Sequence, residues 1–197
     1  MIGPHQFYLS VIGKGYSEGY GFQCVAGFKE FCKMVLGVDF FGKSMCYGGN
    51  PSGYAYRIWY NFDSLGLGKY FEKVPANKMQ DGDWAIWNYN SPPCRQSHIA
   101  MFRKDNGNGT GIFLGQNQGC DGARFSQVNI SYNGLLGALR PKIYIQGEKV
   151  DQILHKGSKV QLTGTYTVKE VNKKEDTVLI NIAGKDCWIK AGPLKEV

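Results

Sequence analysis

The chain has 197 residues, of which 43% are hydrophobic and 14% aromatic, and its formal net charge is +7. This length allows one domain of ordinary size and a small second one, and the apolar content excludes a disordered chain. No clustered basic tract or nucleic-acid-reading motif occurs, so an anionic polymer such as a cell wall fits the charge at least as well, and we expect no nucleic-acid partner. We expect no membrane insertion, because no stretch approaches the roughly twenty apolar residues of a membrane span.

The first part of the chain has the pattern of an α+β domain. Residues 24–36 carry apolar side chains at spacings of three and four and end at Gly37, which predicts an amphipathic helix. A second helix is predicted over residues 54–60 and 61–70. Strands are predicted over residues 84–87, 98–103, 112–117, 128–132 and 136–140, separated by glycine-rich turns. An early helical part followed by antiparallel strands is typical of α+β proteins.

The last part of the chain has a different pattern of apolar and polar residues. Residues 159–195 alternate apolar and polar side chains in three runs, which predicts a small β-barrel or sheet. We therefore expect a domain over residues 1–141, a linker over 142–155 and a small all-β module over 156–197.

Cys24 is the first candidate for a catalytic role. It follows the glycine-rich segment 19–21 and begins the predicted helix. The unpaired N–H groups of a helix N-terminus stabilise a thiolate, so we expect a lowered thiol pKa and a nucleophile. A small buried hydrophobe is the alternative reading of such a cysteine.

A cysteine nucleophile needs a base and a group that orients the base. His98 begins a predicted strand and Asn117 ends the next one, so antiparallel pairing could bring them side by side. His5 and His155 lie in the terminal segment and the linker and fit this role less well. Taken alone, His98 could instead be an interior histidine, and Asn117 could be a turn residue.

The six cysteines lack the spacing of a zinc site or of a disulfide framework, so we expect mostly buried thiols and no metal or other cofactor.

Four segments in this order resemble the CHAP family, the cysteine- and histidine-dependent amidohydrolases and peptidases of bacterial cell walls. The similar segments are YGFQC at 20–24, DGDWAIW at 81–87, SHIA at 97–100 and LRP at 139–141. The resemblance covers about residues 10–141. It implies a papain-like fold in which the first domain has amino-terminal helices and an antiparallel sheet.

The resemblance also implies roles for individual residues. Cys24 would be the nucleophile, His98 the general base and then acid, and Asn117 the group that orients the imidazole. The Cys24 backbone N–H would stabilise the oxyanion, with Gln23 and Gln116 as further oxyanion or orienting candidates. Tyr20 and Trp87 are candidate substrate contacts.

The chain departs from the family in two places. Many members carry Glu two residues before the Asn, where this chain has Gly115, so the carboxylate that would polarise the histidine is absent. Some members carry an acidic calcium loop before the cysteine. Here residues 14–19 contain only one carboxylate, so we expect no structural calcium.

The last strands are similar to a bacterial SH3-type wall-binding module, with Tyr166 and Trp188 as candidate contacts or, alternatively, as core residues. A CHAP domain joined to such a module, with no signal-peptide pattern at the amino terminus, is similar to a bacteriophage endolysin. Such an enzyme stays in the host cytoplasm until a holin releases it to the wall.

The expected function is therefore peptidoglycan hydrolysis by a monomer, through cleavage of amide bonds in peptide stems or cross-bridges. N-acetylmuramoyl-L-alanine amidase specificity is an alternative, because the same Cys-His machinery serves both reactions. A catalytically inactive wall-binding or phage structural protein is a second alternative, kept open by Gly115. A papain-like protein protease or deconjugating enzyme is a third.

Overall fold

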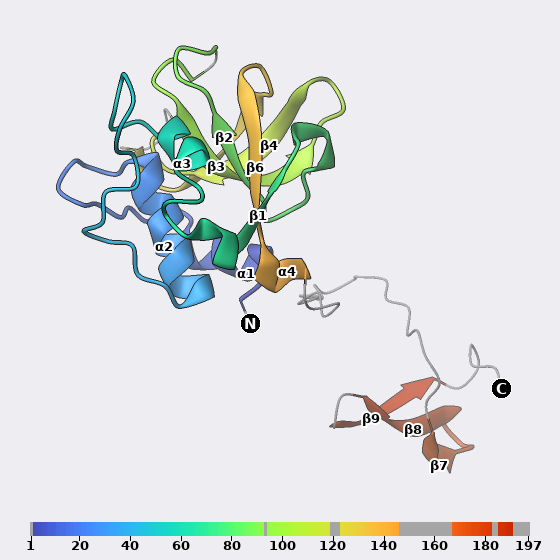
Figure 1. Ribbon diagram of the computed structural model, residues 1–197. Coiled ribbons are helices and arrows are strands. Elements are labelled where there is room, and N and C mark those ends of the chain that lie inside the picture. Colours follow the sequence, from blue (N-terminus) through green and yellow to red (C-terminus); the bar gives the residue numbers. More distant parts are fainter. Residues whose placement is uncertain (1, 93, 119–122, 146–166, 183–184, 191–197) are drawn as a thin grey trace. The chain divides into compact units, whose positions relative to one another are not determined.

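The computed structural model describes residues 2–92, 94–118, 123–145, 167–182 and 185–190 (Figure 1). The chain divides into two compact units, Met1–Ile153 and Leu154–Val197. In the first unit the helices are α1 (Pro4–Val11), α2 (Cys24–Leu36), α3 (Tyr56–Tyr60) and α4 (Lys142–Ile145), with the 3-10 turns η1 (Leu67–Lys69) and η2 (Ala76–Lys78). Its strands are β1 (Phe71–Val74), β2 (Trp84–Trp87), β3 (His98–Asp105), β4 (Thr110–Gly115), β5 (Ser126–Ser131) and β6 (Leu135–Pro141).

Helix α2 confirms the prediction from apolar spacing. Phe28, Phe31, Cys32 and Val35 are buried on one face. Gly37 ends the helix with a φ of 69°, a left-handed conformation that glycine adopts without steric cost.

The helix predicted over residues 54–70 is much shorter in the structure. Only the five residues of α3 are α-helical, and Gly66 interrupts the segment with a φ of 65° before η1. Helix α1 is an element that the sequence pattern did not predict.

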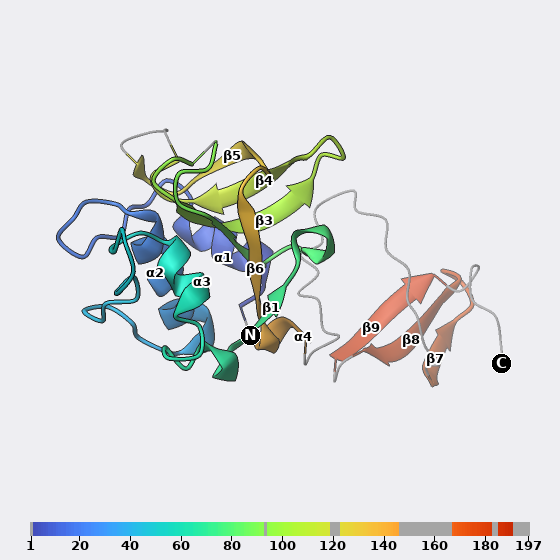
Figure 2. The same ribbon diagram turned by 45° about the horizontal axis from the view of Figure 1, so that its top comes forward.

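The six strands of the first unit form one sheet in the order β1-β6-β2-β3-β4-β5, and each described neighbouring pair is antiparallel. Helices α1 and α2 lie against one face of this sheet in both ribbon views (Figures 1 and 2). The predicted strands at 84–87, 98–103, 112–117, 128–132 and 136–140 are present with ends shifted by up to two residues. This is the mixed α+β arrangement that the sequence predicts.

Alternation along the strands gives the sheet two apolar cores. On the helix side, a cluster of large aromatic residues fills the layer between α1, α2 and the sheet; it includes Phe7, Phe28, Phe31, Phe71, Trp84 and Phe125. The opposite face carries a smaller cluster that includes Trp87, Ala100, Phe102 and Phe113. Because side chains alternate along β3, His98 belongs to the same face as Ala100 and Phe102.

A buried ion pair ties two central strands together. Asp83, which is 1% exposed, accepts hydrogen bonds from Arg140 Nε at 3.0 Å and Nη2 at 2.8 Å. This bidentate contact joins the start of β2 to β6, and so links two of the motifs that carry the family resemblance.

The first unit continues beyond Pro141, where the sequence placed the start of a linker. In α4 the Lys142 backbone N–H donates to Tyr70 O at 2.8 Å, and the Tyr144 ring packs edge-on against Phe31.

In the second unit, β7 (Val168–Asn172), β8 (Thr177–Ile182) and β9 (Lys185–Lys190) form an antiparallel sheet in this order. Val178 and Ile180 are buried there. The predicted strands are found in this sheet, except that residues 159–166 of the first run lie outside the described residues.

Candidate active site

Cys24 is the first residue of α2, at the wall of a cavity of about 1200 Å³. Gln23 precedes it in an extended conformation and ends the glycine-containing turn around Gly19 and Gly21. The backbone N–H groups of Ile99, Val25 and Cys24 itself point to the thiol and favour its ionised form. Burial opposes them more strongly, so the pKa of Cys24 is raised from its ordinary value. The lowered pKa expected from the helix position is therefore wrong for the resting site.

His98 is the first residue of β3 and lines the same cavity as Cys24. Its imidazole is 5% exposed and packs against the Trp87 indole with ring centroids 5.8 Å apart. Burial lowers the pKa of His98 to about 4. A raised thiol pKa and a lowered imidazole pKa together give a neutral Cys24–His98 pair at neutral pH.

Among the described residues, the side chain of Gln118 is a hydrogen-bond partner of the His98 imidazole. Its Oε1 lies 3.1 Å from His98 Nε2. The orientation of this amide is fixed, because Gln118 Nε2 donates to the carbonyl oxygens of Ser126 at 2.8 Å and Phe113 at 3.4 Å. Since the carbonyl oxygen therefore faces the ring, His98 Nε2 must carry the proton, and Nδ1 is left as the basic nitrogen.

Gly115 makes the room for Gln118. A Cβ at this position would lie 2.9 Å from Gln118 Oε1, closer than real Cβ contacts come, and a tight 3.0 Å from Ala100 Cβ. The glycine stands where the CHAP resemblance leads one to expect glutamate, and it allows the Gln118 side chain to reach the histidine. Gln118 was not predicted from the sequence, although the glycine two residues before Asn117 was a signal that could have pointed to it.

Asn117 does not make the contact expected of it. It adopts a left-handed φ of 58°, and its Nδ2 donates to Gln23 Oε1 at 3.1 Å. Gln23 Nε2 in turn donates to Tyr20 O at 2.8 Å. Asn117 and Gln23 both line the cavity, so they form a polar rim beside Cys24.

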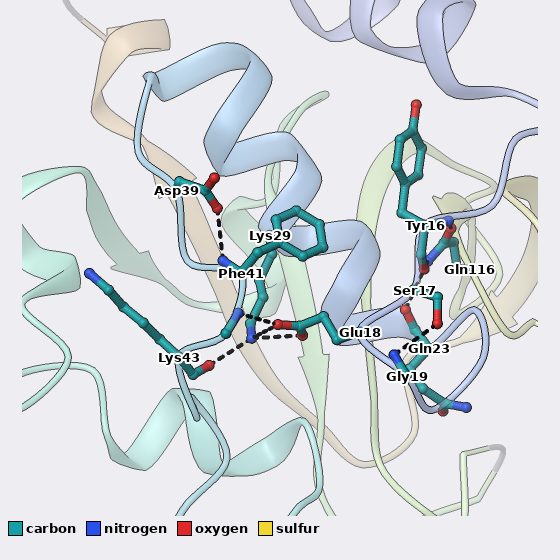
Figure 3. Close-up of polar contacts among 11 residues, drawn as sticks. Tyr16, Ser17, Glu18, Gly19, Gln23, Lys29, Asp39, Phe41, Lys43 and Gln116 are labelled. Carbon is teal, nitrogen blue, oxygen red and sulfur yellow. Dashed lines mark hydrogen bonds and ion pairs between the residues drawn. The ribbon is translucent and has the colours of Figure 1, made fainter.

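Gln116 lies behind the site. It is fully buried, accepts a hydrogen bond from the Tyr16 N–H at 2.7 Å, and donates from Nε2 to Tyr16 O at 3.1 Å and Gln23 O at 2.9 Å. All polar atoms of its amide are committed to the backbone that leads to Cys24 (Figure 3). This side chain positions the nucleophile's segment and is not placed to contact an oxyanion.

A buried lysine, which was not predicted from the sequence, connects the segments that form the cavity wall beside Cys24. Lys29 is 4% exposed, and its Nζ contacts Glu18 Oε1 and Oε2, each at 2.7 Å, and Lys43 O at 2.7 Å (Figure 3). Glu18 also accepts the Gly42 N–H at 2.9 Å. The charges of Lys29 and Glu18 cancel, and the contacts join α2 to two segments of the cavity wall. The single carboxylate of residues 14–19 is thus engaged by a lysine.

The candidate substrate contacts predicted from the sequence differ in their exposure to solvent. Tyr20 is 84% exposed and lines the cavity, as a substrate contact would. Trp87 is fully buried and donates its indole N–H to Ser131 O at 2.9 Å, so it supports His98 from behind and is not a substrate contact. Trp188 is 49% exposed on β9 of the second unit, and Tyr166 lies outside the described residues.

Cys46 and Cys94 also line the cavity and are free thiols. Burial is the main cause that raises the pKa of each to about 12. In the part of the chain that the structure describes, no group of three or more His, Cys, Asp or Glu side chains could hold a metal ion. The described helices include none long and apolar enough to cross a membrane.

Comparison with curated proteins finds sequence similarity to a bacteriophage enzyme. The chain is 36% identical over 126 residues to a D-alanyl-L-alanine endopeptidase of Streptococcus phage B30, and the match covers 64% of this chain. The chain spans about a quarter of that relative's length, since the match covers 26% of it. No family model matches the chain. Among solved structures, the endolysin LysIME-EF1 aligns with a TM-score of 0.49 and 18% identity, over 72% of this chain and 65% of that one.

Proposed function

We propose that this chain is a CHAP-type peptidoglycan hydrolase of the endolysin kind, which cleaves an amide bond of the wall peptides through Cys24. The observation that carries the proposal is the shared cavity of Cys24, at the start of α2, and His98, whose Nε2 is held by Gln118. The name of the phage relative and the four ordered motifs support the same activity.

The proposed reaction begins with a neutral pair. As Cys24 Sγ bonds to the carbonyl carbon, its proton passes to His98 Nδ1, the nitrogen that Gln118 leaves basic. The carbonyl oxygen becomes an oxyanion, for which the Cys24 backbone N–H is a donor. The Gln23 amide lines the cavity and carries two N–H groups, so it is a second donor candidate.

The tetrahedral intermediate collapses when the C–N bond breaks and His98 gives its proton to the leaving amine. A thioester between Cys24 and the acyl part of the substrate remains. His98 then removes a proton from water, the oxygen attacks the thioester carbonyl, and the new carboxyl product and the Cys24 thiol are released. Each step uses groups of this chain and water alone.

We propose cleavage between D-alanine and L-alanine, the bond that the relative's name specifies. An amidase that cuts at the sugar lactyl group would use the same residues, and the termini of the products separate the two reactions. The inactive-scaffold alternative depended on Gly115, and the contact of Gln118 with His98, which supplies a partner in place of the missing carboxylate, supports the active enzyme instead.

For the second unit we propose an SH3-type wall-binding role, with Trp188 as an exposed contact. The enzyme would act at the cell wall after release from the host cytoplasm.

The experiment is digestion of purified Gram-positive peptidoglycan by the wild-type chain and by Cys24→Ala, followed by mass spectrometry of the soluble products. We expect new D-alanine carboxyl and L-alanine amino termini from the wild type only. Release of intact stem peptides from the lactyl group would instead show an amidase. The hydrolase proposal fails if the wild type releases nothing from several wall chemotypes.

A further inference from the structure

A group of tyrosines around α3 has no part in the proposed reaction. Tyr54, Tyr60 and Tyr89 form what we call the tyrosine patch. Tyr60 is 57% exposed and Tyr89 is 38% exposed, while Tyr54 is half-buried. Exposed aromatic rings that gather in one place mark a binding surface more often than chance placement does.

The rings of the patch are held in a connected arrangement. Tyr54 and Tyr89 have ring centroids 5.0 Å apart, and the buried Tyr56 ring lies 6.1 Å from Tyr89 and 5.9 Å from Tyr60. The Arg57 guanidinium lies over the Tyr56 and Tyr60 rings, at 5.5 and 5.7 Å from their centroids. Tyr56 thus forms a buried support, and the patch presents preordered ring faces and edges.

The patch is continuous with the cavity that holds Cys24 and His98. Tyr54 lines that cavity. The Tyr56 N–H donates to Ser97 Oγ at 2.7 Å, and Ser97 Oγ donates to Trp87 O at 2.7 Å, so α3 is fastened to the residue directly before His98. Helix α3 also lies beside α2 in both ribbon views (Figures 1 and 2) and beside β2 in Figure 1. A molecule that extends out of the cavity past Tyr54 therefore meets the patch.

The chemistry of the patch suits a sugar chain. Tyrosine rings offer flat apolar faces to the C–H groups of a pyranose ring, and their hydroxyls and a nearby guanidinium offer hydrogen bonds to its polar groups. An aliphatic peptide or protein partner would call for a larger apolar surface than three tyrosines. In peptidoglycan the peptides are attached to sugar strands, so a bound peptide places a strand near the cavity.

We propose that the tyrosine patch binds the amino-sugar strand of peptidoglycan while the attached peptide occupies the cavity. This inference rests on the proposed function, because it assigns the peptide to the cavity. Sugar binding would hold the enzyme at the wall and raise the local concentration of scissile peptides.

The test compares two substrates of the same peptide sequence. One is intact peptidoglycan, and the other is the cross-linked peptide freed of sugar by an amidase. For the double variant Tyr60→Ala/Tyr89→Ala we expect kcat/KM on intact peptidoglycan to fall about tenfold, with less than a twofold change on the free peptide. The variant Tyr60→Phe/Tyr89→Phe keeps the rings and should retain most of the activity. Leu9→Ala, an exposed residue of α1, is the control for loss of exposed apolar surface.

An equal fall on both substrates would overturn the proposal, because the patch would then bind peptide or support the fold. No change on either substrate would overturn it as well. A second measurement separates this inference from the proposed function: titration of the Cys24→Ala chain with an N-acetylglucosamine oligomer, followed by NMR. Binding that the double alanine substitution abolishes supports the patch even if no peptide bond is cut, and absence of binding to the parent chain contradicts it.

Discussion

The contact between Gln118 and His98 leads to a prediction that distinguishes the structure from the sequence motif. Gln118→Ala removes the Oε1 contact to His98 Nε2 and both donations from Nε2. A neutral hydrogen bond contributes about 0.5 to 1.5 kcal/mol net, and about 1.4 kcal/mol corresponds to a tenfold change in rate. We therefore expect kcat to fall about tenfold with little change in KM, because the imidazole loses its fixed orientation and tautomer.

The same substitution also has a cost in stability. The carbonyl oxygens of Ser126 and Phe113 lose a donor, which lowers the free energy of unfolding by about 1 to 3 kcal/mol and leaves the protein folded. Kinetics on a soluble cross-linked peptide and urea unfolding measure the two effects separately. Asn117→Ala is the matched control, since its amide contacts Gln23 at the rim, and its kcat should change by less than about threefold. A large fall for Asn117→Ala with unchanged kinetics for Gln118→Ala would refute this reasoning.

Three further predictions concern the residues around the site. Gly115→Ala places a Cβ 2.9 Å from the orienting amide oxygen and 3.0 Å from the buried Ala100 Cβ, so kcat should fall and the free energy of urea unfolding should fall by about 1 to 3 kcal/mol; an unchanged kcat would contradict the role of this glycine. Lys29→Met leaves the partly exposed Glu18 carboxylate without its buried partner, which should lower the free energy of urea unfolding by about 3 kcal/mol. The control is Lys33→Met, which removes an exposed ion pair with Asp39 and should lower the free energy of unfolding by less than about 1 kcal/mol. Equal losses for the two variants would show that burial of the ion pair is unimportant. Because the His98 pKa of about 4 lies below the ordinary value near 6.5, the unfolded state binds a proton first as the pH falls. The contribution of His98 to the free energy of unfolding is therefore fully present above about pH 6.5. As the pH falls toward 4, the free energy of unfolding should decrease by about 3 kcal/mol. His98→Gln lacks this component, and parallel pH curves from urea unfolding of the two proteins would contradict the assignment.

The parts of the fold that follow from local patterns could be predicted from the sequence. Apolar spacing and a terminal glycine defined α2, and alternation with glycine-rich turns located the strands from residue 84 onward. Helix α1 was missed because its eight residues are too few to show a helical period, and its stability depends on packing of Phe7 and Val11 against the core. The length of α3 was overestimated because its aromatic residues serve packing and surface contacts more than helical periodicity.

The site could be predicted only in part, for physical reasons. Sequence order indicated Cys24 and His98, and the structure places both at one cavity. Gln118, and not Asn117, contacts His98 because of the conformation of the turn after β4. Sequence spacing does not indicate in which direction each side chain of such a turn points. The raised pKa of Cys24 depends on burial, which outweighs the helix N-terminus, and the burial of Trp87 became visible only with the sheet's second core.

The most direct test of the account is to trap the acyl-enzyme. The wild-type chain is mixed with a soluble cross-linked peptide, quenched in acid within the first turnover, digested, and mapped by mass spectrometry. We expect the acyl part of the substrate to be attached to the peptide containing Cys24, and we expect the Cys24→Ala chain to show neither adduct nor cleavage. Cleavage that persists in Cys24→Ala, or an adduct on another of the cysteines, would contradict the central claim.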